Sequence, residues 1–254
     1  MKLLFTVCGR AGSSGVKSKN IRPFLGVPLF EYTLAAISSF IESNKEKYED
    51  IFCVVSTDSE NFIEQVKARE NKKFYIINRN AELSLNATPK MHVIKDALET
   101  VEKKSGQKFD LIIDLDITSP IRTIKDIQDA IDKKIGNVKT DVVFSVTDAR
   151  RNPYFNMVKQ DGLFVTKVID NSYTARQQAP KVFDMNASIY VYGRSFLLSG
   201  VKSPLDGRAD IIEMPDTGVL DIDSERDFEL MQVIAKWVFD NNIEYRASLQ
   251  NLKK

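Results

Sequence analysis

Residues 2–29 read KLLFTVCGRAGSSGVKSKNIRPFLGVPL and combine a strand with a cationic turn. Residues 3–7 form a continuous apolar run with β-branched and aromatic members, which is typical of a strand buried in a parallel sheet. Three glycines follow it, Gly9, Gly12 and Gly15, and after them come three cations, Lys17, Lys19 and Arg22. Glycine lets backbone N–H groups approach an anion closely, and Lys and Arg neutralise its charge, so the turn favours phosphate.

Two well-known phosphate loops do not fit this turn. The P-loop needs a glycine followed directly by Lys and then Ser or Thr, and no such triplet occurs here. The dinucleotide-binding fingerprint needs G-x-G-x-x-G, whereas these glycines are spaced G-x-x-G-x-x-G. The simplest alternative to a phosphate site is a basic surface loop after an edge strand.

Apolar runs alternate with helical patterns along the chain that follows. Strands are expected over 51–57, 74–77, 109–115, 141–146 and 187–192, and helices after Pro28, after Ser59, after Pro89, from Thr123 and over 226–239. This alternation predicts an α/β fold, with a Rossmann-like, mostly parallel sheet and helices on both faces. We expect residues 1–254 to form a single domain.

The pattern changes between residues 150 and 185, where we expect an inserted lobe. Residues 155–159 and 164–168 are short alternating pieces that predict hairpins and loops. The lobe is too short to build its own core, yet it carries four aromatic residues: Tyr154, Phe155, Phe164 and Tyr173. It should therefore need a partner surface, which predicts a small β/loop dimerisation lobe.

Composition excludes several classes of protein. The formal net charge of +1 argues against a nucleic-acid binder, and no apolar run is long enough to span a membrane. Cys8 and Cys53 lie in apolar contexts, which suggests reduced thiols, and no signal peptide is evident, so we expect a cytoplasmic protein. His92 is the single histidine, which makes Ser-His-Asp chemistry or a zinc site improbable.

Ligands of an open parallel sheet bind beyond the carboxyl ends of its strands. The segments expected there are 8–20, 57–59, 78–86, 116–122, 148–154 and 221–223. Together they hold cations, carboxylates and hydroxyls, the mixture that a nucleoside triphosphate, a metal ion and an acidic polar substrate would require.

The turn R-A-G-S-S-G-V-K-S-K-N resembles the opening of the cytidylyltransferases that activate sialic acids, roughly A-R-x-G-S-K-G-I/V-x-x-K-N. The resemblance implies that Arg10, Gly12, Ser13, Ser14, Lys19 and Asn20 bind the nucleotide. It also implies that Arg10 and Lys19 act in catalysis by taking the charge of the leaving pyrophosphate. Ser14 departs from the family, which usually has lysine there.

Two further blocks carry the resemblance. Residues 78–84, NRNAELS, resemble the family's R-P-A-E-L-A/S, which implies that Arg79 and Ser84 contact the nucleotide. Residues 115–122, LDITSPIR, resemble L-Q-P-T-S-P-L-R. This block, with Arg176 and the strand at Asn186, supplies the implied sugar-binding residues: Asp116, Thr118, Ser119, Arg122, Arg176 and Asn186.

Asp116 replaces a glutamine of the family. A carboxylate can only accept hydrogen bonds, so it should select a substrate N–H or hydroxyl. Residues 114–116 and 184–188 also resemble the legionaminic branch of the family more than the main sialic-acid branch. We therefore expect a 5,7-diacylamino sugar acid rather than N-acetylneuraminate.

Asp221 and Asp223 match the family's D-I-D-x-x-x-D-F/W and are the expected metal ligands. In a strand-like segment two such carboxylates share one face and can hold one divalent cation. The alternative is a group of acids gathered at a helix start by the helix dipole. The resemblance implies Mg²⁺ here, bridging the triphosphate and the attacking hydroxyl, with Asp221 and Asp223 acting in catalysis.

The resemblance implies transfer of CMP from CTP to the anomeric hydroxyl of a nine-carbon keto-sugar acid, with release of pyrophosphate, by a homodimer. Either a carboxylate of the acidic pair or a metal-bound water would accept the proton. A nucleotide-sugar glycosyltransferase is one alternative, although it would have no need of the turn at residues 10–20. A catalytically silent nucleotide-binding regulator is another, which Ser14 favours.

Overall fold

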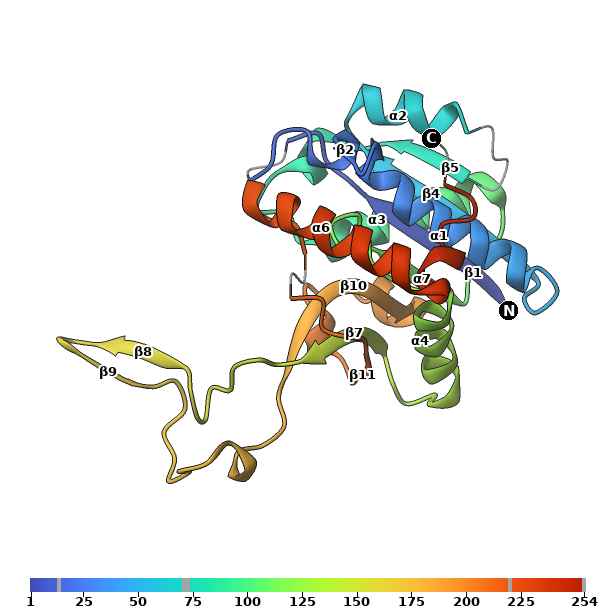
Figure 1. Ribbon diagram of the computed structural model, residues 1–254. Helices are drawn as coiled ribbons and strands as arrows, with labels where there is room; N and C mark the ends of the chain where they lie inside the picture. The colour runs from blue at the N-terminus through green and yellow to red at the C-terminus, as the bar shows by residue number, and fades with distance from the viewer. Residues whose placement is uncertain (13–14, 70–73, 219–220, 253–254) are drawn as a thin grey trace.

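The computed structural model describes residues 1–254 except 13–14, 70–73, 219–220 and 253–254. A seven-stranded sheet in the order β11-β7-β10-β6-β1-β4-β5 forms its centre (Figure 1). The strands are β1 (Lys2–Cys8), β4 (Asp50–Thr57), β5 (Phe74–Asn78), β6 (Leu111–Leu115), β7 (Val142–Asp148), β10 (Phe183–Gly193) and β11 (Ala209–Glu213). All neighbouring strands pair in parallel except where β10 meets β6 and β7. The prediction of a mostly parallel sheet is confirmed.

Helices cover both faces of the sheet, as predicted. One face carries α1 (Leu29–Asn44), α2 (Glu60–Lys67), α4 (Ile124–Gly136), α6 (Glu225–Asn241) and α7 (Ile243–Ala247), and the other carries α3 (Lys90–Ser105) and α5 (Arg194–Leu198). Alternation along β1 produces the two cores, because Phe5 and Val7 pack on the first face and Leu4 on the second.

The topology brings the carboxyl ends of six strands to one edge of the sheet, since β11 also pairs in parallel with β7. β1, β4, β5 and β6 run parallel, and β7 shares their direction because both β6 and β7 pair antiparallel with β10. The chain proceeds outward from β1 through β4 to β5 and then returns to β6 on the other side of β1. Such a switch point between β1 and β6 is where an open sheet binds its ligand.

Sequence patterns missed some elements at the periphery. β11 is an edge strand whose segment RADIIEMP mixes polar and apolar residues without clear alternation. The hairpin of β2 (Pro23–Phe24) and β3 (Val27–Pro28) is too short to leave a periodic signal. β10 begins earlier than expected and its register shifts between Met185 and Tyr190, where Ala187 has a left-handed φ of 52°.

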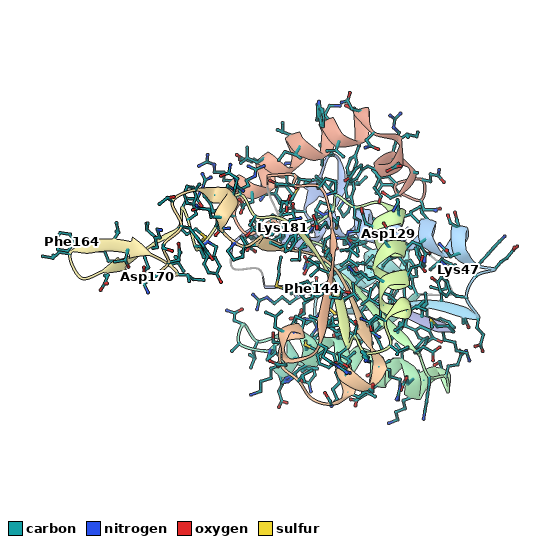
Figure 2. The ribbon with its side chains drawn as sticks, turned by 90° about the horizontal axis from the view of Figure 1, so that it is seen from below. Lys47, Asp129, Phe144, Phe164, Asp170 and Lys181 are labelled. Atoms are coloured by element: carbon teal, nitrogen blue, oxygen red, sulfur yellow. The ribbon has the colours of Figure 1, made fainter. Side chains whose placement is uncertain are left out.

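The inserted lobe projects from the body as a long arm (Figures 1 and 2). Its tip is a hairpin of β8 (Val158–Asp161) and β9 (Phe164–Lys167). The hairpin was predicted, but its first strand begins later than expected, because Asn152 O accepts bonds from the N–H groups of Phe155, Asn156 and Met157 and closes a turn there. Within the described chain, no helix is both long and apolar enough to cross a membrane.

Candidate active site

The turn after β1 is held tightly against the body. A Cβ atom at Gly9 would lie 2.8–2.9 Å from side-chain atoms of Asn20, Phe62 and Ile117, so the space admits no side chain. Asn20 Nδ2 donates to Arg10 O at 3.0 Å, which closes the turn on itself. These contacts explain the glycine directly after the strand and position Asn20 for a role in shaping the turn.

The rest of the turn is only partly described. Ala11 N donates to Asp58 Oδ1 at 2.7 Å, which ties the turn to the end of β4. Gly12 is exposed, and a Cβ there would meet no atom within 4 Å. Ser13 and Ser14, both expected to bind nucleotide, lie outside the described residues.

The acidic segment near the C-terminus packs against this turn. A Cβ at Gly15 would lie 1.7 Å from Asp223 O, so only glycine permits the contact. Lys19 Nζ donates to Ile222 O and lies 3.6 Å from Asp223 Oδ1. Ile222 N in turn donates to Thr118 O at 3.0 Å. Three segments that are far apart in the sequence are thereby joined, as the resemblance implied.

A hollow of about 200 Å³ opens between these three segments. It is lined by Cys8, Gly9, Arg10, Gly15, Lys19, Asn20, Asp116, Thr118 and Asp223. We call it the first hollow. Two cations, Arg10 and Lys19, face two carboxylates across it, which suits a polyanion bound together with a metal ion.

A second hollow of about 250 Å³ adjoins the first and shares Cys8, Arg10 and Asp116 with it. Its other lining residues are Arg79, Leu83, Leu85, Asn86, Thr88, Lys90 and Val93. Arg79 is buried and fixed to the end of β4, donating to Ser56 O at 2.6 Å and to Ser56 Oγ at 3.1 Å. Arg10 Nη1 donates to Asn86 Oδ1. Ser84 does not line either hollow, because its hydroxyl turns back to donate to Asn80 O.

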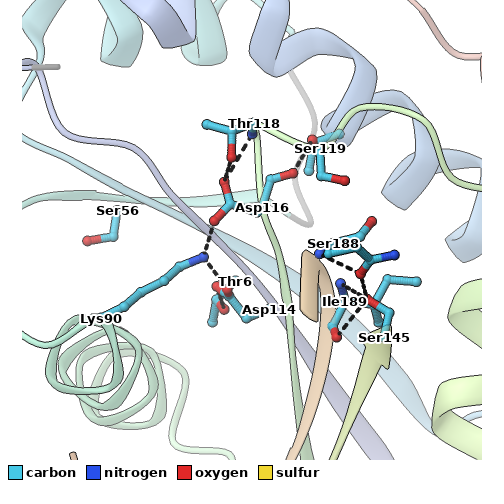
Figure 3. A network of polar contacts seen from close by, with 12 residues as sticks. Thr6, Ser56, Lys90, Asp114, Asp116, Thr118, Ser119, Ser145, Ser188 and Ile189 are labelled. Atoms are coloured by element: carbon cyan, nitrogen blue, oxygen red, sulfur yellow. Dashed lines mark hydrogen bonds and ion pairs between the residues drawn. The ribbon is translucent and has the colours of Figure 1, made fainter. Parts of the chain in front are cut away.

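Asp116 lies between the two hollows, and both of its oxygens already accept hydrogen bonds (Figure 3). Oδ1 accepts from Thr118 N at 3.0 Å and Thr118 Oγ1 at 2.9 Å, and Oδ2 accepts from Lys90 Nζ at 2.6 Å. Burial alone would raise the pKa of Asp116, but the charge and hydrogen bond of Lys90 and the bonds from Thr118 lower it to about 2. Asp116 is therefore an ionised, firmly held group.

Two predicted sugar-binding residues lie beneath the surface of this loop. Arg122 is 1% exposed, and its Nη2 donates to the carbonyls of Asp116 and Ser119. Ser119 is also buried and lines neither hollow. Arg122 and Ser119 therefore shape the loop that carries Asp116, and their expected contact with the sugar stays a prediction.

Asn186 and Arg176 do not join the cluster in this chain. Asn186 is buried in the irregular part of β10, where Oδ1 accepts from Ser145 Oγ at 2.6 Å. This hydrogen bond stabilises the β10 irregularity, and the expected sugar contact of Asn186 stays a prediction. Arg176 lies on the arm and donates to Ala149 O at 3.1 Å, lining a separate hollow with Asp148.

The acidic segment fits a divalent cation in its donor set. Residues 221–223 are irregular rather than strand-like, with Asp223 exposed and Asp221 half-buried. Burial and then the negative charges of Asp223 and Asp116 raise the pKa of Asp221. A cation would relieve this repulsion. The described residues include no group of three His, Cys, Asp or Glu placed to hold a metal, so ligands would also have to come from substrate phosphate or water.

The acids at the start of α6 divide between two roles. Asp227 and Ser224 form a capping box, which satisfies the helix-start interpretation for Asp227. Asp223 makes no such side-chain bond to the helix start and faces the first hollow instead. The helix-start interpretation therefore holds for Asp227, and the assignment of Asp223 as a metal ligand stays a prediction.

Sequence reasoning did not single out three residues of the site: Asp58 and Asn86, which lie in segments expected at the ligand-binding edge, and Lys90, which lies outside those segments. Each follows the carboxyl end of a parallel strand or begins a helix there. None of the three belongs to a recognisable motif, so only their position near a strand end or helix start could have identified them from the sequence.

Comparison with known proteins identifies relatives over nearly the whole chain. The sequence model of a family described as Cytidylyltransferase matches residues 5–201. A CMP-N,N'-diacetyllegionaminic acid synthase from Campylobacter jejuni is 34% identical over 99% of this chain and 97% of its own. A post-translational flagellin modification protein B from Campylobacter coli is 35% identical over 92% of this chain and 95% of its own. A CMP:2-keto-3-deoxy-manno-octonic acid synthetase complexed with CTP has the same fold, with a TM-score of 0.64 at 17% identity over 93% of this chain and 99% of its own.

Proposed function

Since the chain belongs to the cytidylyltransferase family, we propose that it transfers CMP from CTP to the anomeric hydroxyl of a nine-carbon keto-sugar acid and releases pyrophosphate. One observation carries the proposal. The glycine turn, the loop of Asp116 and the acidic segment meet around the first hollow, where Arg10 and Lys19 oppose Asp116 and Asp223. Phosphoryl-type transfer needs positioning and charge stabilisation more than covalent chemistry, and these groups supply both.

In this proposal the triphosphate occupies the first hollow. Arg10 and Lys19 bind its oxygens and stabilise the charge that develops on the leaving pyrophosphate. Lys19 also donates to Ile222 O, so the same side chain holds the acidic segment at the site. Mg²⁺ held by Asp221 and Asp223 would supply further neutralisation of the triphosphate.

The nucleoside then occupies the second hollow, beside Arg79. Arg79 donates hydrogen bonds from Nε and Nη2 to Ser56, and these two bonds fix its guanidinium in place. A guanidinium so held presents its remaining N–H donors in one direction, which suits a carbonyl or ribose oxygen. Ser84 would contribute only by shaping the loop that forms the hollow's wall.

For the acceptor we propose a 5,7-diacylamino sugar acid of the legionaminic type. The support is the similarity over nearly the whole chain to a protein named as a diacetyllegionaminic acid synthase. Asp116, ionised at the junction of the two hollows, retains one unused acceptor position on its carboxylate for a substrate N–H or hydroxyl. Thr118 lies beside it in the first hollow.

We expect pyrophosphate release from CTP and Mg²⁺ with at least one sugar acid from a panel of N-acetylneuraminic, legionaminic, pseudaminic and Kdo acids. The highest kcat/KM should belong to the diacylamino sugar. Asp116→Gln is measured in parallel, because its amide N–H can donate to an acylamino carbonyl and should shift the kcat/KM ratio between the two sugar types by about 1–3 kcal/mol. Folded protein that is inactive across the panel would refute the proposed reaction.

We further propose that the working form is a homodimer in which the arm reaches the partner's site. The hairpin exposes Leu163 and Phe164 at 93% and 77%, which is costly for a surface with no partner. The arm also holds Arg176 outside both hollows of its own chain, so this cation would serve the neighbouring subunit.

A dimer predicts that Leu163→Asp/Phe164→Asp yields a monomer with reduced turnover and an unchanged body. Sedimentation at micromolar concentration reports the assembly, and thermal unfolding reports the fold. Replacing an exposed valine far from the arm, Val233→Asp on α6, gives the matched control and should leave both assembly and activity unchanged. A wild-type monomer with full activity would contradict the dimer.

A further inference from the structure

Lys90 lines the second hollow and joins two carboxylates, Asp116 in the same lining and Asp114 outside it (Figure 3). Its Nζ lies 2.7 Å from Asp114 Oδ2 and 2.6 Å from Asp116 Oδ2. Asp114 is fully buried in β6, and its other oxygen accepts from Thr6 Oγ1 at 2.7 Å. Across the described chain no other Lys or Arg forms an ion pair with either acid. Lys90 is therefore the one Lys or Arg of the described chain that is in ion-pair contact with both acids.

The place of Lys90 in the fold is locally unfavourable. It is the first residue of α3, where the helix dipole favours an acid and disfavours a cation. Two carboxylates at hydrogen-bonding distance offset that cost. A residue whose local position is unfavourable, and which is stabilised by tertiary contacts instead, is typical of a functional site.

The two acids lie next to where an anionic ligand would bind. Asp116 lines both hollows, and Asp223 adds a further carboxylate to the first. Without Lys90, the negative charges of Asp114 and Asp116 would act on the triphosphate across a partly buried space, where charges are weakly screened. The side chain of Lys90 is 38% exposed and open to the hollow, so its effect extends to a ligand there.

We propose that Lys90 is a positioning residue for CTP binding: it neutralises Asp114 and Asp116 and fixes Asp116 at the junction of the two hollows. This inference rests on the proposed function, because it assigns the two hollows to CTP. Lys90 acts through Asp116 rather than by taking part in the chemistry. The same pair also limits how Asp116 meets the sugar, since Oδ2 is held by Lys90 and Oδ1 by Thr118.

The test is a double-mutant cycle on CTP affinity, measured by calorimetry with Mg²⁺ and no sugar. Lys90→Met should weaken CTP binding at least about tenfold (1.4 kcal/mol), because it leaves negative charge unbalanced beside the triphosphate. Lys90→Arg keeps the cation and should stay within about threefold of wild type. Adding Asp116→Asn to Lys90→Met should recover most of the lost affinity, which a merely structural role for Lys90 would not do.

Lys103→Met is the matched control, since Lys103 is exposed on the same helix, about 20 Å along its axis from Lys90 at 1.5 Å per residue. It should leave CTP affinity unchanged. If Lys90→Met does not fold, the CTP affinity of Asp116→Asn is compared with that of Asp116→Asn/Lys90→Met. The two affinities should differ by less than about threefold.

Two results would overturn the inference: folded Lys90→Met that binds CTP like wild type, or a double variant that recovers nothing. Wild type that binds no CTP would instead refute the proposed function, and the inference with it. Wild-type turnover with a sugar acid alongside an unaffected Lys90→Met would leave the function standing and remove only the role of Lys90.

Discussion

Asp223→Asn is expected to keep the fold and to lose Mg²⁺-dependent turnover by about 10²-fold or more. The Asp223 side chain is 78% exposed, so its replacement should change the free energy of unfolding by less than about 0.5 kcal/mol. Charge stabilisation by a catalytic metal contributes several kcal/mol, and each 1.36 kcal/mol is a factor of ten in rate. Steady-state kinetics over a Mg²⁺ titration and thermal unfolding separate the two effects.

Glu229→Gln is the matched control for Asp223→Asn. Glu229 is an exposed acid on α6, the helix that follows Asp223, and lies outside both hollows, so its neutralisation should leave turnover unchanged. If Asp223→Asn retained wild-type turnover at every Mg²⁺ concentration, the acidic segment would be no more than a helix-start cluster.

Gly15→Ala is expected to reduce kcat/KM by about 10²-fold, although it adds a single methyl group. The new Cβ would lie 1.7 Å from Asp223 O, a backbone atom, so the glycine turn and the acidic segment would have to separate. A displacement of about 1 Å in such a site can cost 10²-fold. The loss should be accompanied by a weaker dependence of rate on Mg²⁺, because the displaced residue carries a proposed metal ligand.

Gly136→Ala tests whether any glycine substitution would do the same. A Cβ at Gly136 would meet no atom within 4 Å, so this variant should match wild type in both activity and unfolding temperature. An active Gly15→Ala would mean that the turn and the acidic segment are not in contact in the working enzyme.

The fold could be predicted where burial imposes a pattern. β1 and β4 are buried on both faces and read as continuous apolar runs, and α3, α4 and α6 each bury one face, whereas α1 is buried all round over residues 29–40. The edge strand β11 could not, because it is solvated on one side and short. Propensity and periodicity say little about such a strand, whose position is set by pairing with β7.

The site could be predicted as a set of loops but not as a set of contacts. The carboxyl-end rule and the resemblance brought residues 10–20, 116–122 and 221–223 together, and the structure joins them through Lys19 and Ile222. Which polar side chains face the hollow depends on partners elsewhere in the chain. Arg122 turned inward to backbone carbonyls, and Lys90 was missed because its two partners lie on β6 and in the loop after it.

Mass spectrometry of the reaction products is the most direct measurement of the proposed activity. Wild-type protein, CTP, Mg²⁺ and a diacylamino nine-carbon sugar acid should give one CMP-linked sugar for each pyrophosphate released. No product should form when CTP is omitted or Asp223→Asn replaces wild type. Binding of CTP with neither a CMP-linked sugar nor pyrophosphate, for any sugar acid of the panel, would contradict the transferase function and leave a nucleotide-binding protein without this chemistry.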